Sequence, residues 1–292
     1  MVINILICDA FPGLLPPGIP SYEWMFMQKF DGSAHLMELQ LEYKLYNAYL
    51  GQLPQNLKAD ELYVITGSNS SAYDQHPWIL SLLDWIRRAD AEKVKLVGIC
   101  FGHQAIALAL GGTVERNPQG WGAGIRMAQV LDTRPEPKLK NHFKNSIMNL
   151  VCHHHDQVTQ LPPQAKRMAT SEFCSNEGFF IGSHIITFQG HPEFPTSYME
   201  HLLRNHSQSE DEYVRYEALN SLATLPNQGN LVIRYILEFA FNAKIRVKPQ
   251  APVEPLNPRR RSTSKYGYRY KRPNYNYRYL KKSNPNAKTK TT

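Results

Sequence analysis

The stretch Lys95-Leu-Val-Gly-Ile-Cys-Phe-Gly-His-Gln-Ala-Ile-Ala-Leu-Ala-Leu-Gly-Gly112 decides the fold, because in it an apolar run leads directly into a helical pattern. Residues 94–99 are β-branched and bounded by charge, which predicts a buried strand. Residues 104–110 have the composition of a buried helix, and the two glycines that follow are typical of a helix end. The sequence therefore predicts that Cys100 lies where a strand meets a helix.

Cys100 is the centre of a Gly-x-Cys-x-Gly pattern whose spacing has a physical reason. A strand that turns directly into a helix strains its corner residue, and small neighbours such as Gly98 and Gly102 let the backbones pass. Unpaired N–H groups and the helix dipole favour a thiolate at such a corner, and the N–H of Phe101 is well placed to face an oxyanion. The same letters also fit a buried structural cysteine between two packing glycines, so the motif alone leaves both interpretations open.

Apolar strands alternate with helical patterns along the first part of the chain, which predicts a mostly parallel sheet with helices on both faces. We therefore expect an α/β, three-layer sandwich of the flavodoxin-like kind. After Gly112 the strand-like segments are shorter and bounded by turns, which indicates a small subsidiary antiparallel β sheet. The expected strands are residues 2–8, 35–41, 62–66, 94–99, 113–115, 124–131, 147–152, 167–171 and 179–188, the expected helices are residues 22–30, 77–91, 104–110, 200–206, 210–222 and 231–243, and residues 131–143 are expected to be a surface excursion.

The positive charge of the chain is concentrated at its C-terminal end. The 292 residues have a formal net charge of +8, but residues 246–292 hold 14 of the 33 Lys and Arg residues against the single acid Glu254, so residues 1–245 carry a net charge of −5. Prolines are frequent and aliphatic residues rare in this end of the chain, so it cannot bury a core. We expect a globular domain over residues 1–247 and a basic, Tyr-rich, disordered tail over residues 248–292.

The four cysteines, Cys8, Cys100, Cys152 and Cys174, show no spacing typical of a disulfide framework, which favours a reducing compartment and a cytoplasmic location. The first residues reach a charge at Asp9 with no basic segment before it, so they predict a first strand rather than a signal peptide. No apolar run approaches the roughly 18 residues of a membrane span, so no transmembrane segment is expected.

A second motif, Ile185-Ile-Thr-Phe-Gln-Gly-His-Pro-Glu-Phe194, supplies what a cysteine nucleophile needs. Such a nucleophile requires a base that takes its proton, and the base requires an orienting partner. His191 follows the end of a predicted strand, and Glu193 lies two residues further on, within reach of the other imidazole nitrogen. On its own, a His-Pro-Glu tripeptide would equally fit a surface loop.

The two motifs together are far more specific than either alone. The segments Gly98-Ile-Cys-Phe-Gly-His-Gln104 and Phe188-Gln-Gly-His-Pro-Glu-Phe194, in this order, resemble those of class I glutamine amidotransferases. Within that family, the chain is similar to the stand-alone group akin to the amidotransferase half of GMP synthase and to plant γ-glutamyl peptidases. The resemblance, which runs over residues 2–240, implies the fold of that family, with Cys100 as the nucleophile, His191 as the base and Glu193 as its orienting residue.

Two further parts of the site follow from the resemblance. The turn Thr66-Gly-Ser-Asn69 matches the family's glycine-rich turn, whose backbone N–H is the second oxyanion donor beside that of Phe101. A serine and an asparagine replace the second glycine and the proline that the family often has there, so the N–H of Gly67 and the N–H of Ser68 are both candidates. Gln104 matches a position that helps to hold the substrate's glutamyl group, although the residues alone would equally allow a glutamine on the helix surface.

The run His153-His-His-Asp-Gln-Val158 invites a metal-binding interpretation, which its spacing does not favour. Successive side chains on a strand alternate between its faces, so three consecutive histidines cannot all face one ion. The run resembles the family's His-x-Asp-x-Val segment beside the active site. This resemblance implies that His154, His155 and Asp156 contact the substrate near its α-amino and carboxylate groups. We expect no metal ion and no cofactor.

The implied reaction is hydrolysis of a γ-glutamyl amide bond, in glutamine or in a γ-glutamyl peptide, through a thioester on Cys100. The sequence contains no Gly-x-x-x-x-Gly-Lys-[Ser/Thr] loop, so ammonia transfer would need a separate synthetase subunit. A different function rests on residues 259–282, where six tyrosines alternate with cations in a pattern suited to RNA or to an anionic surface. A solvated tail has the same composition. The intact Cys, His and Glu set argues against a binding module on an inactive enzyme scaffold.

Overall fold

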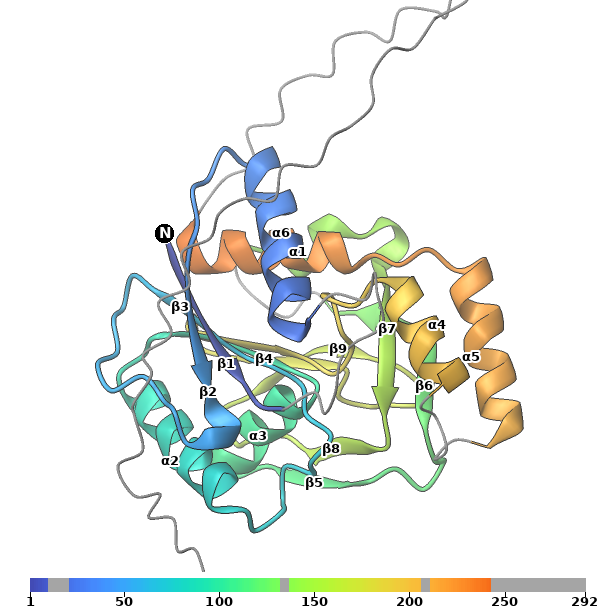
Figure 1. The fold of residues 1–292 in the computed structure, drawn as a ribbon, viewed down its shortest axis with the longest axis horizontal. Coiled ribbons are helices and arrows are strands. Elements are labelled where there is room, and N and C mark those ends of the chain that lie inside the picture. Colours follow the sequence, from blue (N-terminus) through green and yellow to red (C-terminus); the bar gives the residue numbers. More distant parts are fainter. Residues whose placement is uncertain (10–20, 132–136, 206–210, 243–292) are drawn as a thin grey trace, which may run out of the picture. The chain divides into compact units, whose positions relative to one another are not determined.

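A computed structural model describes residues 1–9, 21–131, 137–205 and 211–242 (Figure 1). All of them belong to one compact unit, residues 1–248, which is distinct from the unit of residues 249–292. The tail expected over residues 248–292, with the candidate RNA-binding segment 259–282, lies outside the described residues.

A nine-stranded sheet runs through this unit in the order β2-β1-β3-β4-β11-β10-β9-β6-β7. The first five strands in that order are parallel, and the remaining neighbours pair antiparallel. Two further strands, β5 and β8, form a small antiparallel sheet. The strands are β1 (Val2–Ile7), β2 (Glu42–Asn47), β3 (Leu62–Ile65), β4 (Lys95–Ile99), β5 (Thr113–Arg116), β6 (Gly122–Val130), β7 (Ile147–His154), β8 (Asp156–Gln160), β9 (Lys166–Thr170), β10 (Gly178–Ile181) and β11 (Ile185–Phe188).

Helices cover both faces of the parallel part of the sheet. In Figure 1, α1 and α6 lie on one side of it, and α2 and α3 lie on the other. The α-helices of the described part are α1 (Tyr22–Leu36), α2 (Pro77–Ala91), α3 (Phe101–Ala109), α4 (Thr196–Asn205), α5 (Glu212–Thr224) and α6 (Gly229–Phe241), and the short 3₁₀ helices are η1 (Ala48–Leu50), η2 (Leu139–His142) and η3 (Lys144–Ser146).

The parallel strands contribute side chains to two separate hydrophobic cores, because successive side chains of a strand point to opposite faces. In β1, Ile3 and Ile5 belong to the core under α1 and α6, whereas Leu6 belongs to the core under α2 and α3. In β3, Val64 belongs to the core under α1 and α6, and Tyr63 belongs to the core under α2 and α3. Both faces of these strands are buried, which explains why the strands are apolar throughout. The expected three-layer α/β sandwich is confirmed.

The antiparallel region differs in detail from the expectation. The small antiparallel sheet is present as β5 and β8, but the other short strands continue the main sheet beyond β11. Residues 179–188, expected as one strand, form the two strands β10 and β11 around a turn at Gly182, whose φ is +52°. Gly182, Ser183 and His184 are the signal of this turn in the sequence, and they separate two fully buried strands.

The strand expected at residues 35–41 is wrong. Helix α1 continues to Leu36, and the strand that follows begins only at Glu42. Phe30, Ala34 and Met37 are buried at helical spacing against the core, and this burial continues the helix into the segment.

Residues 131–143 are not the surface excursion that their prolines suggest, so far as the structure describes them. Leu139 and Phe143 are only 2% and 6% exposed and belong to the core, because η2 packs against α6. The helix expected at residues 104–110 begins earlier, at Phe101. No helix of the described residues is long and apolar enough to cross a membrane.

Candidate active site

Cys100 is the single residue between strand β4 and helix α3. Its backbone has a φ of 52° and a ψ of −105°, a region that a non-glycine residue adopts only under strain, at a cost of about 1–3 kcal/mol. A Cβ atom on Gly98 would lie 2.5 Å from the carbonyl O of Gly102, and one on Gly102 would lie 2.3 Å from that of Ile65. The corner therefore requires both glycines, and it holds Cys100 at the N-terminus of α3.

His191 follows strand β11, and its N–H donates to the carbonyl O of Val151 at 2.7 Å. Its ring Nδ1 lies 2.7 Å from Oε1 of Glu193, which is fully buried. A carboxylate oxygen only accepts hydrogen bonds, so Nδ1 carries the proton and Nε2 remains for the Cys100 sulfur. A Cβ atom on Gly67 would lie 2.9 Å from Cε1 of His191 and 3.7 Å from Cβ of Cys100, so the two side chains converge on the turn after β3.

The surroundings of His191 favour its protonated form. Burial by itself lowers the pKa of His191, but Glu193 and Cys100, by charge and by hydrogen bonding, outweigh burial and raise this pKa to about 10. Phe194 stacks on the imidazole with the ring centroids 4.0 Å apart and an angle of 6° between the ring planes. The stacked ring and the carboxylate together hold the imidazole in one orientation.

The turn after β3 presents backbone N–H groups beside these side chains. The N–H of Gly67 donates to the hydroxyl of Tyr22 at 2.9 Å. In the part of the chain that the structure describes, the N–H groups of Ser68 and Phe101 have no hydrogen-bond acceptor. Of the two candidates for the second oxyanion donor, Ser68 thus has a free N–H, whereas the N–H of Gly67 is engaged.

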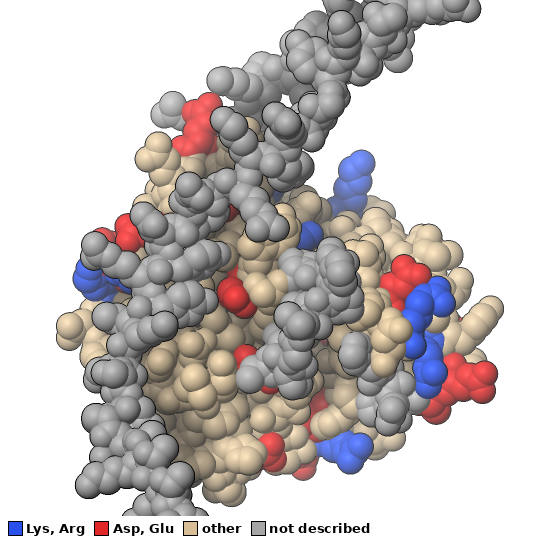
Figure 2. All heavy atoms as spheres, viewed as in Figure 1, with Lys and Arg blue, Asp and Glu red and all other residues tan. Residues whose placement is uncertain are grey.

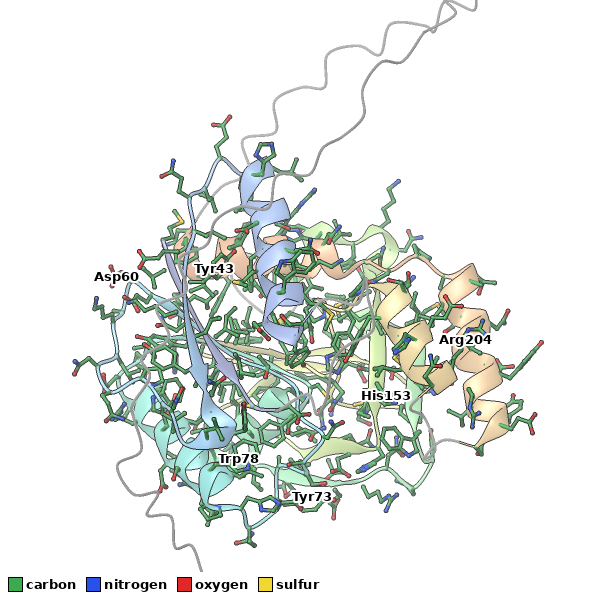
Figure 3. The ribbon with its side chains drawn as sticks, viewed as in Figure 1. Tyr43, Asp60, Tyr73, Trp78, His153 and Arg204 are labelled. Carbon is green, nitrogen blue, oxygen red and sulfur yellow. The ribbon has the colours of Figure 1, made fainter. Side chains whose placement is uncertain are left out.

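The buried carboxylate of Asp156 anchors the loop that follows this turn. Its Oδ2 accepts a hydrogen bond from the Ser71 hydroxyl at 2.5 Å. Its Oδ1 accepts one from the hydroxyl of Tyr73, which is labelled in Figure 3, at 3.2 Å and one from Nδ1 of His155 at 2.6 Å. The side chain of Asp156 therefore binds three groups of the protein itself and holds the loop against β8.

Gln104 is buried in α3 and does not lie on the helix surface. Its Nε2 donates to the carbonyl O of Asp156 at 2.8 Å and to Oε1 of Gln189 at 3.2 Å. Nε2 of Gln189 in turn donates to Sγ of Cys100 at 3.7 Å. Both N–H bonds of the Gln104 amide are engaged within the protein, so the amide oxygen is the group that it can offer to a substrate.

The three consecutive histidines occupy different environments. His154 is buried with its Nδ1 3.0 Å from the carbonyl O of Asp156, and burial lowers its pKa to about 3. His153, labelled in Figure 3, and His155 are half-buried and contact Trp121, with ring centroids 4.9 and 4.7 Å apart. Within the described ranges, no group of three or more His, Cys, Asp or Glu side chains is arranged to hold a metal ion.

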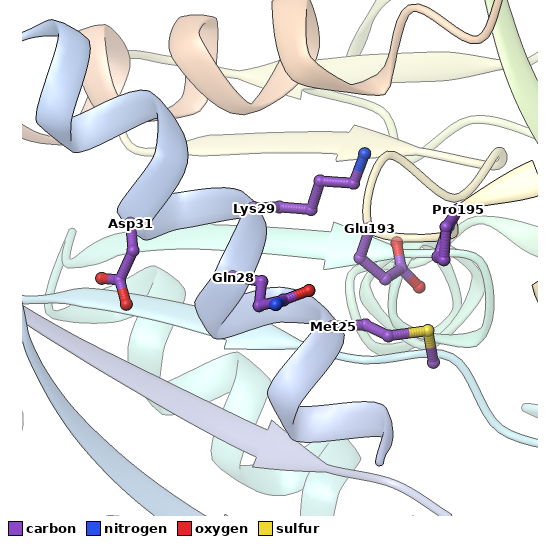
Figure 4. Close-up of a pocket in the computed structure, with 6 residues that line it drawn as sticks. All are labelled: Met25, Gln28, Lys29, Asp31, Glu193 and Pro195. Atoms are coloured by element: carbon purple, nitrogen blue, oxygen red, sulfur yellow. The ribbon is translucent and has the colours of Figure 1, made fainter. Parts of the chain in front are cut away.

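A cleft of about 530 Å³ opens on the α1 side of Glu193 (Figure 4). Oε2 of Glu193 has no hydrogen-bond partner in the described chain. The ammonium group of Lys29 donates to Oδ1 of Asn230 at 3.1 Å, and burial lowers the pKa of Lys29, against the opposing effect of the Glu193 charge. The cleft is lined by Met25, Gln28, Lys29, Asp31, Glu193 and Pro195. It therefore reaches Glu193 from the side of α1.

The other three cysteines are poor candidates for a nucleophile. Cys8, Cys152 and Cys174 are buried free thiols, and burial raises the pKa of each of them. Their thiolate forms are therefore disfavoured, and they are poor nucleophiles.

The geometry brings a cysteine at a helix N-terminus together with a His–Glu pair and two free backbone N–H groups. Residues 33–208, more than half of the chain, match the family described as "Glutamine amidotransferase class-I". The chain belongs to the class I glutamine amidotransferase family. Cys100, His191 and Glu193 lie within the matched residues, whereas Tyr22 precedes them.

Individual members of this family show how far the similarity extends. Gamma-glutamyl peptidase 3 of Arabidopsis thaliana is 34% identical over 160 residues, which cover 52% of this chain and 63% of the plant protein, less than two thirds of its length. A candidate glutamine amidotransferase of Saccharomyces cerevisiae is 34% identical over 206 residues, which cover 67% of this chain and 79% of the yeast protein. The crystal structure of a glutamine amidotransferase from Thermotoga maritima has the same fold, with a TM-score of 0.61 and 20% identity over 82% of this chain and 97% of that one.

Three residues of the site were not identified from the sequence. Gln189 and Phe194 lie inside the second motif, but nothing in the pattern says that one contacts the sulfur and the other stacks on the imidazole. Tyr22 is separated from Gly67 by 45 positions, and no local signal points to it.

Proposed function

We propose that this class I glutamine amidotransferase hydrolyses a γ-glutamyl amide bond without a synthetase domain in the same chain. The observation that carries the proposal is the position of His191, whose imidazole interacts with both Cys100 and Glu193. The N–H groups of Ser68 and Phe101, which have no acceptor among the described residues, follow Gly67 and Cys100 in the chain. This combination supplies a nucleophile, a base and oxyanion donors in one place.

Because the surroundings of His191 favour its protonated form, the proton of the Cys100 thiol lies on Nε2 of His191 before the reaction begins. The Cys100 sulfur then attacks the γ-carbonyl carbon of the substrate. The carbonyl oxygen becomes an oxyanion, which the N–H groups of Ser68 and Phe101 stabilise. The C–N bond then breaks, and the amine leaves with the proton from His191. Water, deprotonated by the same imidazole, attacks the thioester and releases glutamate and the free thiol. Glu193 holds the imidazole and balances its positive charge throughout.

Gln104 and the residues around Asp156 are proposed to bind the substrate and to support the loop. The Gln104 amide oxygen is available to the glutamyl group. Asp156 links Gln104 to the half-buried His155, because its carbonyl O accepts from Gln104 and its carboxylate accepts from His155. We propose that His154 and Asp156 shape this end of the site chiefly through the groups they hold, since their own hydrogen bonds go to the protein.

The substrate is proposed to be glutamine or a γ-glutamyl peptide, and the names of the plant relatives support the second class. The test is a panel of glutamine, γ-glutamyl dipeptides and glutathione incubated with the purified protein, with glutamate release measured. We expect release from at least one member and none from Cys100→Ser, while Cys8→Ser, a change at a buried thiol directly after β1, retains activity. Equal release by wild type and Cys100→Ser would contradict the proposal.

A second candidate is the supply of ammonia to a separate synthetase subunit. It differs from free hydrolysis in one observable respect, because an ammonia-supplying subunit turns over glutamine slowly until its partner is present. Rapid turnover of a γ-glutamyl peptide by the protein alone would favour the peptidase. Slow turnover of glutamine, with none of the peptides, would favour the subunit.

We also propose that residues 259–282 bind RNA or an anionic surface independently of the catalytic chemistry. The support comes from the sequence, in which Lys, Arg and Tyr alternate, and from the charge of residues 1–245, which is −5. Figure 2 shows basic and acidic side chains interspersed on the visible face of the described residues, without an extended basic area there. Polyanion binding is therefore expected to come from residues 259–282, because residues 1–245 carry a net negative charge.

A cytoplasmic location is proposed on the basis of the thiols. All four cysteines are free, and a cysteine nucleophile must stay reduced to act. Fractionation of cells that express the full chain tests this proposal, and recovery of the protein from an oxidising compartment would contradict it.

A further inference from the structure

Tyr22, the first residue of α1, is buried and reaches the site from outside both sequence motifs. Its hydroxyl accepts a hydrogen bond from the N–H of Gly67 at 2.9 Å and donates one to Oε1 of Glu193 at 3.2 Å. The same Oε1 lies 2.7 Å from Nδ1 of His191. One hydroxyl therefore joins the turn that carries the free N–H of Ser68 to the carboxylate that orients His191.

The direction of these hydrogen bonds is set by the chemistry of the partners. A backbone N–H only donates and a carboxylate oxygen only accepts, so the hydroxyl must accept from Gly67 and give its single proton to Glu193. Burial, reinforced by the charges of Glu193 and Cys100, raises the pKa of Tyr22 well above its ordinary value. The hydroxyl therefore keeps its proton, and the bridge has one orientation.

Aromatic packing holds the Tyr22 ring in this place. Its centroid lies 5.5 Å from that of Phe26 and 5.8 Å from that of Phe194, and Phe194 is the ring that stacks on His191. A Cβ atom on Gly67 would lie 2.5 Å from the Tyr22 hydroxyl oxygen, so the turn packs directly against the tyrosine. Helix α1 thus contacts the turn, the carboxylate and the ring that supports the base.

We propose that Tyr22 is a positioning residue, which fixes the turn of residues 66–69 relative to Glu193 and engages the N–H of Gly67 so that the N–H of Ser68 faces the oxyanion. The catalytic consequence rests on the proposed hydrolase function, whereas the bridge itself does not. Without the hydroxyl, Gly67 loses an acceptor and Glu193 loses one of two donors to Oε1. The turn and the carboxylate are then free to move apart.

The first test compares Tyr22→Phe with Tyr63→Phe. Tyr63 is the matched control, because its buried hydroxyl also accepts a backbone N–H at 2.9 Å, that of Lys58, and it lies in the core under α2 and α3. Tyr22→Phe is expected to lower kcat roughly ten- to a hundredfold with little change in KM, as misplacement of catalytic groups does. Tyr63→Phe is expected to retain kcat even if its melting temperature falls as much. Equal kcat values in wild type and Tyr22→Phe would overturn the proposal.

A double-mutant cycle separates positioning from general destabilisation. If Tyr22 acts in part through Glu193, the loss of kcat on Tyr22→Phe must be smaller in the Glu193→Gln background than in the wild type. Tyr63→Phe should have the same small effect in both backgrounds. Losses from Tyr22→Phe and Glu193→Gln that simply multiply would contradict the coupling.

A measurement without substrate distinguishes failure of this inference from failure of the proposed function. The proton on Nδ1 of His191 can be followed by NMR in protein with ¹⁵N-labelled histidine, since it bonds the oxygen that also accepts from Tyr22. We expect its resonance to shift or broaden in Tyr22→Phe and to stay in place in Tyr63→Phe. A shift in a protein that releases no glutamate would refute the hydrolase and leave the bridge intact, whereas an unmoved resonance would refute the bridge whatever the activity.

Discussion

His191 and His154 are both buried and lie close enough to interact electrostatically, but their environments act in opposite directions. Burial lowers the pKa of His154 to about 3, and the group beside its Nδ1 is an uncharged backbone carbonyl. Burial also lowers the pKa of His191, but Glu193 and Cys100 outweigh it and raise this pKa to about 10. The comparison shows that a carboxylate beside a buried histidine raises its pKa and suits it to act as a base. A buried histidine without such a carboxylate stays neutral.

The largest effect is expected when the charge that distinguishes the two histidines is removed. Glu193→Gln keeps the shape of the side chain and leaves burial to dominate, so the pKa of His191 falls. We expect kcat/KM to drop roughly a thousandfold or more. The alkaline limb of the pH–rate profile, expected near pH 10 from the pKa of His191, should move to lower pH.

The pH–rate profile of glutamate release measures both effects. Glu172→Gln, a change of the same kind at an exposed position, is the control and should reproduce the wild-type profile. An alkaline limb that stays in place in Glu193→Gln would mean that Glu193 does not set the protonation of His191.

A smaller effect is expected on the His154 side, where Asp156 supports the loop. Asp156→Asn removes the charge that receives the Ser71 and Tyr73 hydroxyls, so the loop with the Ser68 N–H should loosen. We expect kcat to fall about tenfold with KM nearly unchanged, since a misplaced donor weakens oxyanion stabilisation. Steady-state kinetics against the exposed control Asp84→Asn provides the measurement. A rise in KM at constant kcat would instead show direct contact between Asp156 and the substrate.

The neutrality of His154 is tested by the pH dependence of stability. Its pKa is about 3 in the folded chain and 6.5 when unperturbed, so below pH 6.5 the unfolded chain binds a proton that the folded chain does not. Stability is therefore lost as the pH falls, by about 1.4 kcal/mol at pH 5.5 for this one group. The variant His154→Asn keeps a donor near the position of Nδ1 and should show a loss smaller by that amount.

Urea unfolding at pH 7.5 and pH 5.5 gives the two free energies whose difference is compared. His76→Asn, at an exposed position, serves as the control and should show the wild-type difference. Equal differences in wild type and His154→Asn would mean that His154 is not held neutral by burial.

The smallest effect on catalysis is expected from removal of the basic tail. Deletion of residues 248–292 removes 13 of the 33 Lys and Arg residues and no apolar core, so glutamate release and melting temperature should barely change. Affinity for RNA or for anionic vesicles should fall sharply, and in the full chain it should weaken steeply with salt. Loss of folding on truncation, or retention of polyanion binding, would show that the boundary at residue 247 is wrong.

Local patterns in the sequence were enough to predict the centre of the fold. The corner at Cys100 depends on two glycines within two residues of it, and the His–Glu pair spans three positions, so both are visible as short motifs. The parallel strands were predictable because burial on both faces makes them continuous apolar runs. The single strand expected at residues 179–188 is wrong, because the turn Gly182-Ser183-His184 interrupts the apolar residues and makes a hairpin.

Features that depend on tertiary contacts could not be predicted. The strand expected at residues 35–41 is wrong because the helical burial of Ala34 and Met37 becomes evident only beside the core. The hydrogen bonds of Gln104 run to partners 52 and 85 positions away, so the sequence could not distinguish a surface glutamine from one engaged inside the protein. The hydrogen bond from the Tyr22 hydroxyl to Glu193 joins residues that are 171 positions apart in the sequence, so no local pattern could reveal it.

The most direct test of the central claim is site-specific labelling by a chloroketone analogue of glutamine, followed by peptide mapping of all four cysteines. Cys100 is predicted to be the modified residue, with glutamine protecting it, because burial raises the pKa of Cys8, Cys152 and Cys174 and disfavours their thiolates. Label spread evenly over the four cysteines, or an unmodified Cys100, would contradict the assignment of Cys100 as the nucleophile.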